Sequence, residues 1–187
     1  MWVKELTTQQ SLEVLSHTHL GRLACARGMQ PYVVPIRFAY RDHWLYSFSE
    51  SGQKIDWMRA NPLVCLEADQ MRREQWATVV VFGRYVELCD TPEFQSVRTL
   101  AFNLLQQQIV MWWEHGGVKT MSAGTPVADP IFYRIKLEQI TGRCGFSEQA
   151  VPDAKQAKAD LDEQEWLLKI FQRVRQTYAV FQQRLDA

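Results

Sequence analysis

Residues 43–62 contain the side chains whose types and spacing could do chemistry. The segment reads HWLYSFSESGQKIDWMRANP. It is aromatic-rich and strand-like at its start, and Ser-Gly then breaks that pattern. The apolar spacing after Gln53 favours a helix that ends before Pro62. The segment therefore predicts a strand, a tight loop with Gly52, and a helix that begins beside Lys54.

A loop of this kind is suited to bind an anion such as a phosphate. The first N–H groups of a helix have no partner within the helix, and the positive end of its dipole lies there. Ser47, Ser49 and Ser51 add hydroxyl groups, and Lys54 adds a positive charge. The alternative is a solvated turn with a surface lysine, which is common for Ser-Gly sequences. Both interpretations stay open on this segment alone.

Composition and charge exclude several classes of protein. The 187 residues include 21 Lys+Arg and 21 Asp+Glu, so the chain lacks the basic balance of nucleic-acid-binding proteins. A hydrophobic share of 47% indicates a globular fold. The four cysteines form no CxxC pair, so no zinc spacing is present. Without an apolar leader or a membrane-spanning run, we expect a soluble cytoplasmic protein with reduced thiols.

Patterns of period two predict six strands, and these strands must position the loop. The expected strands are residues 20–27, 31–42, 43–48, 63–69, 76–90 and 131–143. The expected short helices are residues 7–15, 53–60 and 91–110. Pro31 and Pro35 indicate an edge strand or a bulge, and Gly83 indicates a bulge or a close backbone approach. The fold class is therefore mainly β, a small six-stranded antiparallel barrel with helical additions.

The composition changes near residue 153. Gly and Pro are absent from there on, and apolar residues recur at alternating spacings of four and three. This pattern predicts one long amphipathic helix, which could pack on its own barrel or cross to a partner subunit. We therefore expect a barrel domain of residues 1–147 and a C-terminal helical extension of residues 148–187.

Three sequence pieces, in order, resemble a known family. They are LYS-x-S-x-x-G-x-K from residue 45, NP-x-V-C-x-E-x-D from residue 61, and V-x-G-R from residue 81. Together they resemble the pyridoxamine 5′-phosphate oxidase-like FMN-binding split barrels, and most closely the branch of nitroimidazole-resistance-type flavoproteins. The resemblance spans about residues 15–143. It implies a split β-barrel and a homodimer with two flavin sites at the subunit interface.

The resemblance also implies which residues meet the cofactor. Some would lie along or near the isoalloxazine ring, others would hold the phosphate, and two tryptophans would add a stacking surface that could come from the other subunit. The expected ring residues are Ile36, Arg37, Phe38, Tyr46, Ser47 and Thr78. The expected phosphate residues are Ser49, Gln53 and Lys54, and the tryptophans are Trp112 and Trp113.

The sequence departs from the family pattern at three places. Family members that oxidise pyridoxamine phosphate have an arginine before the phosphate lysine. This chain has Gln53 there, so we expect a weaker grip on the phosphate. Their C-terminal Arg and His signature is absent after residue 143, which disfavours vitamin B6 oxidation. Phe48 stands where the nitroimidazole-resistance branch often has a histidine.

The predicted function is an FMN-dependent oxidoreductase that acts on an unidentified small molecule. A non-catalytic flavin-binding protein and a haem-binding or haem-degrading split barrel remain as alternatives, and a deazaflavin (F420) is an alternative cofactor. Haem would need an axial ligand such as one of the four histidines. No catalytic residue and no metal ligand is assigned. Arg84 is expected to form a structural ion pair with Glu67 or Glu87.

Overall fold

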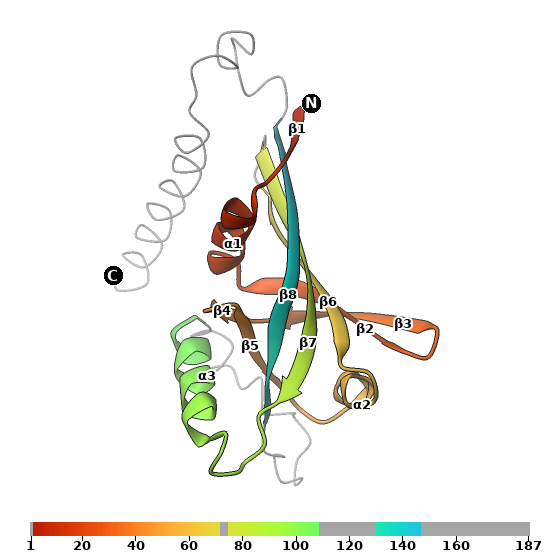
Figure 1. Cartoon of the computed structure of the whole chain (residues 1–187), viewed down its shortest axis with the longest axis vertical. Helices are drawn as coiled ribbons and strands as arrows, with labels where there is room; N and C mark the ends of the chain where they lie inside the picture. Colours follow the sequence, from red (N-terminus) through yellow and green to blue (C-terminus); the bar gives the residue numbers. More distant parts are fainter. Residues whose placement is uncertain (1, 72–74, 109–129, 147–187) are drawn as a thin grey trace, which may run out of the picture. The chain divides into compact units, whose positions relative to one another are not determined.

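The computed structural model describes residues 2–71, 75–108 and 130–146 (Figure 1). Within these ranges the chain is mainly β, as its sequence predicts. The strands are β1 (Trp2–Glu5), β2 (Leu20–Arg27), β3 (Gln30–Arg37), β4 (Ala39–Arg41), β5 (Trp44–Ser49), β6 (Leu63–Met71), β7 (Gln75–Glu87) and β8 (Ile131–Phe146). The helices are α1 (Thr8–Ser16), α2 (Gln53–Ala60) and α3 (Gln95–Gln108).

The strands form one sheet in the order β3-β2-β6-β7-β8-β5-β4, and β1 pairs with β8. The pairs β2–β3, β2–β6, β6–β7, β5–β8 and β4–β5 are antiparallel. The sheet has eight strands rather than the expected six, because β1 was not predicted and residues 31–42 form two strands. Strand β3 lies at an end of the order, which confirms the edge position that Pro31 and Pro35 predict.

The division of residues 31–42 occurs at Phe38, between β3 and β4. The Phe38 N–H donates to the carbonyl of His19 (3.0 Å), outside the regular ladder. Strand β4 then turns back into β5 through Asp42 and His43, which both have positive φ angles of 50° and 64°. Two-residue turns of this type are favoured in twisted hairpins. The turn lies one residue later than the Arg41-Asp42 turn that the sequence suggests.

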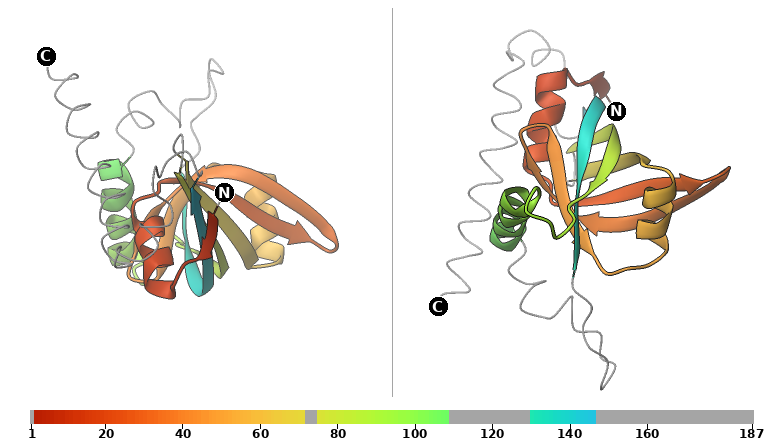
Figure 2. Two further views of the ribbon diagram at one scale, coloured as in Figure 1. Left: turned by 90° about the horizontal axis from the view of Figure 1, so that it is seen from above. Right: turned by 60° about the horizontal axis from the view of Figure 1, so that its bottom comes forward.

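The β2–β3 hairpin projects away from the rest of the sheet in both views of Figure 2. Gly28 has a φ angle of 59° at its turn, and the side chain of Met29 beside it is fully exposed. Helix α2 packs against β2. The ring of Trp57 in α2 contacts that of Tyr32 in β3, with centroids 5.4 Å apart. The hairpin and α2 therefore support one another.

The helices follow their predicted positions with one exception. Helix α1 begins after Thr7, whose side chain and that of Gln10 form the predicted capping box. Helix α2 has the predicted bounds. Helix α3 begins at Gln95 rather than near Thr91, because the Phe94 N–H donates to the Thr91 carbonyl and closes a separate turn first.

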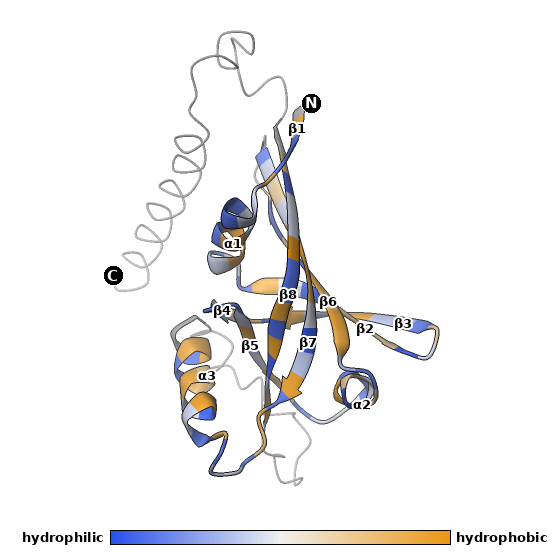
Figure 3. Ribbon diagram, in the orientation of Figure 1, coloured by the Kyte–Doolittle hydropathy of each residue, from blue (hydrophilic) through white to orange (hydrophobic). Residues whose placement is uncertain are grey.

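Strand β5 is buried on both faces, and this explains its run of apolar residues. Tyr46 and Phe48 pack with Ala101 and Leu105 of α3 in one hydrophobic cluster. Figure 3 shows the hydrophobic colouring along α3 that this packing requires. The alternate residues of β5 point to the opposite face, where Ser47 lies directly across from Tyr133 of β8.

One compact unit spans Val3–Gly145. The expected C-terminal helix and the expected boundary at residue 147 lie outside the described residues, so both stay predictions. No helix in the described ranges is long and apolar enough to cross a membrane.

Gly83 confirms the close backbone approach that the sequence suggests. A Cβ atom at this position would overlap the Lys136 carbonyl oxygen and lie 2.7 Å from Cγ2 of Ile135. We expect Gly83→Ala to lower the free energy of unfolding by about 1–3 kcal/mol through overpacking. Gly52→Ala is the matched control, because no atom lies within 4 Å of its added Cβ. Urea denaturation measures both, and equal stabilities would contradict the expected close packing of β7 on β8.

Candidate functional site

The start of α2 lacks a side-chain cap. Its N-cap residue is Gly52, which offers no side-chain hydrogen bond, whereas α1 has a complete capping box. The first helical bond runs from the Asp56 N–H to the Gly52 carbonyl (3.1 Å). The N–H groups of residues 53–55 come before it and have no acceptor within the helix. This end of α2 is therefore suited to an anion.

Lys54 lies in the first turn of α2 and is half-buried. Burial lowers the pKa of its ammonium group, and the nearby Cys25 thiol partly opposes that change. In the part of the chain that the structure describes, no carboxylate forms an ion pair with Lys54. Arg59 of the same helix, in contrast, pairs with both Asp56 and Glu87. Lys54 is thus a partly desolvated cation whose missing counter-charge a bound anion could supply.

Helix α2 is anchored at its other end. The Arg59 guanidinium donates two hydrogen bonds of 2.8 Å to the Glu87 carboxylate, and the Tyr85 hydroxyl donates to the same carboxylate (2.7 Å). The Asn61 side chain donates to the Ala26 carbonyl (3.2 Å). These contacts join α2 to β7 and β2, so the uncapped end is held at a fixed place.

The loop before α2 supplies the remaining expected phosphate ligands. Ser49 ends β5 and is half-buried, and Gln53 begins α2 and is exposed. Both side chains lie within a few residues of Lys54 on one continuous segment. Ser49, Gln53 and Lys54 therefore belong to one loop and helix start, and their role as phosphate ligands stays a prediction.

A second group of predicted residues lies where β3 meets β5. The Ser47 hydroxyl is buried and donates to the Arg37 carbonyl (2.8 Å). Ile36, Phe38 and Tyr46 are also buried, with exposed fractions of 5%, 0% and 4%. The side chains of these three residues belong to the core of this chain. A ligand at the surface would therefore meet their backbone groups or the exposed side chain of Arg37.

Tyr133 is a buried neighbour of this group that no sequence motif indicated. It is fully buried, and burial raises the pKa of its hydroxyl group. The hydroxyl lies close to Ser47, although no hydrogen bond of regular geometry satisfies it among the described residues. The Cys25 thiol is close enough to raise the same pKa further. Polar groups of Ser47, Cys25 and Tyr133 thus line the interior behind Lys54.

Thr78 lies apart from these residues, on the outer face of the sheet in β7. Its hydroxyl donates to the Glu67 carboxylate of β6 (3.0 Å). The Arg22 guanidinium of β2 donates to Glu67 (2.8 Å) and to Asp69 (2.6 Å). Glu67 and Asp69 belong to one of the sequence motifs, but their link to Thr78 is visible only in the structure.

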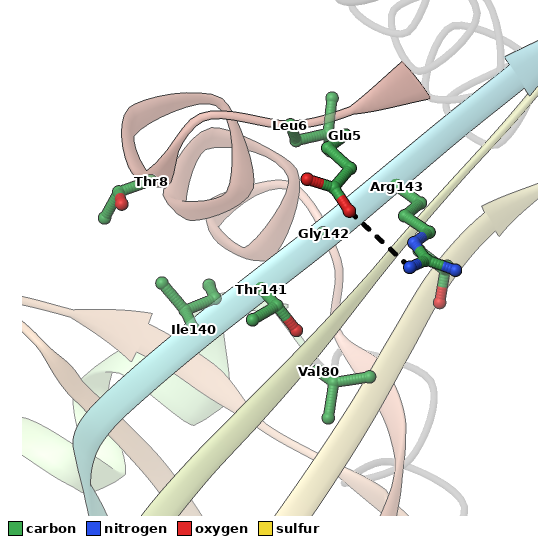
Figure 4. Close-up of a pocket in the computed structure, with 9 residues that line it drawn as sticks. Glu5, Leu6, Thr8, Val80, Ile140, Thr141, Gly142 and Arg143 are labelled. Carbon is green, nitrogen blue, oxygen red and sulfur yellow. Dashed lines mark ion pairs between the residues drawn. The ribbon is translucent and has the colours of Figure 1, made fainter. Parts of the chain in front are cut away.

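Thr78 also lines a cavity of about 500 Å³. Thr8, Val80, Ile140 and Thr141 contribute to the same wall. Figure 4 shows Glu5 and Arg143 at this cavity, joined by an ion pair of 3.5 Å. The cavity combines hydroxyl groups with aliphatic surface, which suits a small molecule that is partly apolar.

Two sequence predictions are not confirmed. Trp112 and Trp113 lie outside the described residues, so their expected stacking role stays a prediction. Arg84 forms an ion pair, but its partner is Glu138 of β8 (3.1 Å) rather than Glu67 or Glu87. The expected partners were wrong because Glu67 lies opposite Val80 rather than Arg84, and because Glu87 pairs with Arg59. In the described ranges, no group of three or more His, Cys, Asp or Glu side chains is placed to hold a metal.

Comparisons with known proteins find relatives over most of the chain. A family model described as pyridoxamine 5′-phosphate oxidase matches residues 7–144. The uncharacterized protein RA0666 of Rhizobium meliloti (strain 1021) is 41% identical over 145 residues, which cover 76% of this chain and 95% of the relative. The crystal structure of an FAD-binding protein from Mesorhizobium loti is also 41% identical. It has a TM-score of 0.66 and covers 78% of this chain and 99% of that chain.

Two more distant structures share the fold. The FAD binding protein of Mycobacterium smegmatis is 21% identical with a TM-score of 0.55, and the match covers 76% of this chain and 98% of that one. A candidate 5-nitroimidazole antibiotic resistance protein of Bacteroides thetaiotaomicron is 17% identical with a TM-score of 0.56, and the match covers 77% and 89%. At these identities the likeness shows the fold alone.

The anchor of α2 predicts a pH-dependent stability. Hydrogen bonds from Arg59 hold the pKa of Glu87 below its ordinary value of 4.5. Glu87 therefore stabilises the fold above about pH 4.5, and this contribution is lost as the pH falls through its lower folded-state pKa. We expect Glu87→Gln to lower the free energy of unfolding by about 1 kcal/mol at pH 7, and to lose less stability than the wild type on acidification.

Glu138→Gln is the control for this experiment, because Glu138 pairs with Arg84 at the surface. Its effect at pH 7 should stay within about 0.5 kcal/mol. Denaturant titrations at several pH values measure all three proteins. Parallel pH profiles for wild type and Glu87→Gln would show that the Arg59–Glu87 contact does not hold α2.

Proposed function

The chain belongs to the pyridoxamine 5′-phosphate oxidase family, and we propose that it binds a flavin nucleotide at α2 and the adjacent sheet. The observation that supports this proposal best is the uncapped start of α2 with the half-buried Lys54, which forms no ion pair within the described ranges. Free N–H groups and a partly desolvated cation together fit a phosphate. The family match spans the whole of this region.

The phosphate would be held by one continuous segment. Lys54 supplies the charge, the first N–H groups of α2 supply directed donors, and Gln53 and Ser49 supply side-chain hydrogen bonds. FMN carries a terminal phosphate, and FAD carries a diphosphate with the same kind of oxygens. We propose FMN as the ligand. The printed name of the Mesorhizobium loti relative, an FAD-binding protein, makes FAD the comparison to test beside it.

The reaction we propose is an oxidoreduction of a small molecule. A bound flavin would supply the electron transfer itself. The chain would hold the phosphate at α2, place the ring against the β3–β5 junction and the Thr78 region, and exclude water with its apolar surface. The substrate and the electron donor follow from none of these residues.

We also propose that the protein is a homodimer. Val33, Ala24, Cys65 and Phe82 lie side by side across β3, β2, β6 and β7 on the outer sheet face. Val33 and Phe82 are 59% and 48% exposed, and Leu63 near them is 53% exposed. An exposed apolar surface on several adjacent strands is typical of a subunit interface. A second copy of this chain, as in the family to which it belongs, is the occupant that we propose.

Substitution of Lys54 tests the phosphate site. We expect Lys54→Ala to weaken FMN binding by about 1–3 kcal/mol, the scale of a charged hydrogen bond, as measured by fluorescence titration. Riboflavin, which has the same ring but no phosphate, should bind wild type and Lys54→Ala equally. Lys54→Arg should retain most of the FMN affinity because it keeps the charge. An unchanged FMN affinity in Lys54→Ala would remove Lys54 from the phosphate site.

A charge on the outer sheet face tests the dimer. We expect wild-type protein to sediment as a dimer at micromolar concentration and Phe82→Asp to sediment as a monomer, because a buried unpaired carboxylate is strongly disfavoured. Met29→Asp is the control, since Met29 is also apolar and its side chain is exposed at the hairpin turn. A monomeric wild type would refute the dimer, and a dimeric Phe82→Asp would place the interface elsewhere.

A further inference from the structure

The outer face of the sheet carries one polar network beside the apolar row. Arg22 lies directly opposite Glu67 on the neighbouring strand, and Asp69 lies opposite Thr78. The guanidinium Nη1 donates to Glu67 Oε2 (2.8 Å) and to Asp69 Oδ1 (2.6 Å). The other Glu67 oxygen, Oε1, accepts from the Thr78 hydroxyl (3.0 Å). Three strands are thereby joined by groups at the surface.

The direction of the Thr78–Glu67 hydrogen bond follows from the donor and acceptor inventory. An arginine only donates and an ionised carboxylate only accepts, so Glu67 accepts at both of its oxygens. A threonine hydroxyl has a single proton. Because Thr78 gives that proton to Glu67, it has only lone pairs left for any other partner. Thr78 is therefore an acceptor toward a ligand.

Thr78 is placed to meet a ligand as well. It is half-buried and lines the cavity of about 500 Å³. The resemblance to the family implies a position near the flavin ring for Thr78. The ring system of a flavin carries an imide N–H, which is a hydrogen-bond donor, next to carbonyl acceptors. An acceptor at Thr78 thus matches the donor group of that edge.

We propose that Glu67 is a positioning residue for the flavin site. Its carboxylate keeps the Thr78 hydroxyl oriented as an acceptor toward the ligand, so that the site selects a ligand edge that donates an N–H. This inference rests on the proposed flavin binding. Glu67 itself need not touch the ligand. Arg22 keeps the carboxylate in place from β2, and Asp69 accepts from Arg22 without a hydrogen bond to Thr78.

Glu67→Gln should reverse the Thr78 hydrogen bond. Because Arg22 only donates, the amide oxygen of Gln would turn to Arg22 and the amide N–H₂ would face Thr78. Thr78 would then accept from Gln and present its proton to the ligand, where it opposes another donor. The expected result is an affinity for FMN that is lower by about two- to tenfold, the range of a single hydrogen bond.

A double-mutant cycle tests whether Glu67 acts through Thr78. Thr78→Val removes the hydroxyl at nearly constant shape. Glu67→Gln should weaken FMN binding in the wild-type and Thr78→Ser backgrounds, but should have no further effect in Thr78→Val. Asp69→Asn is the matched control, because it removes a carboxylate from Arg22 and leaves Thr78 with Glu67. Its effect should be the same in the wild-type and Thr78→Val backgrounds.

Riboflavin separates this site from the phosphate site. Glu67→Gln should weaken riboflavin and FMN by the same factor, because both have the same ring, whereas Lys54→Ala should weaken FMN alone. Additive effects of Glu67→Gln and Thr78→Val, or an unchanged affinity in Glu67→Gln, would overturn the positioning role and leave the proposed function intact. A wild-type protein that binds neither FMN nor FAD would overturn the proposed function and, with it, this inference.

Discussion

The candidate site depends on Lys54, a lysine that is partly withdrawn from water and has no carboxylate partner among the residues that the structure describes. Burial disfavours the charged form of Lys54, so its position is stable only if the rest of the structure holds α2 in place. The two hydrogen bonds from Arg59 to Glu87 and the ring contact between Trp57 and Tyr32 do this. The helix end that they present has no cap of its own. Stability that is gained at the far end of α2 thus maintains an unsatisfied anion site at its start.

The sequence predicted the features that depend on local pattern. The capping box at Thr7, the bounds of α2, and the edge position that Pro31 and Pro35 impose on β3 each follow from a few neighbouring residues. The break at Phe38 was not predictable in this way. It depends on hydrogen bonds to His19 and between Ser47 and Arg37, which are distant in sequence. Strand β1 was missed because it is short, whereas β4 was predicted as part of one strand with β3.

The same distinction holds for the candidate site. Lys54 and its loop form one continuous segment, so their common position was predictable. Phe38 and Tyr46 were expected along a flavin ring, yet both side chains lie in the core. An aromatic residue in a strand suits a ligand site and a packed helix equally well, and for Tyr46 only the placement of α3 over β5 decides between them. Tyr133 has no motif of its own, and its relation to Ser47 appears only through the pairing of β5 with β8.

The two halves of the site therefore differ in how their residues are brought together. The proposed phosphate site needs charge and free N–H groups, and one loop and one helix would provide them. The proposed recognition of the ring edge needs a hydrogen bond of fixed direction, and contacts across β2, β6 and β7 would set that direction. Residues of the outer sheet face, such as Glu67 and Thr78, can therefore change without altering the surroundings of Lys54. A fold of this kind can retain its grip on a nucleotide phosphate while the chemistry at the ring diverges, which is why membership of the family does not by itself name the substrate.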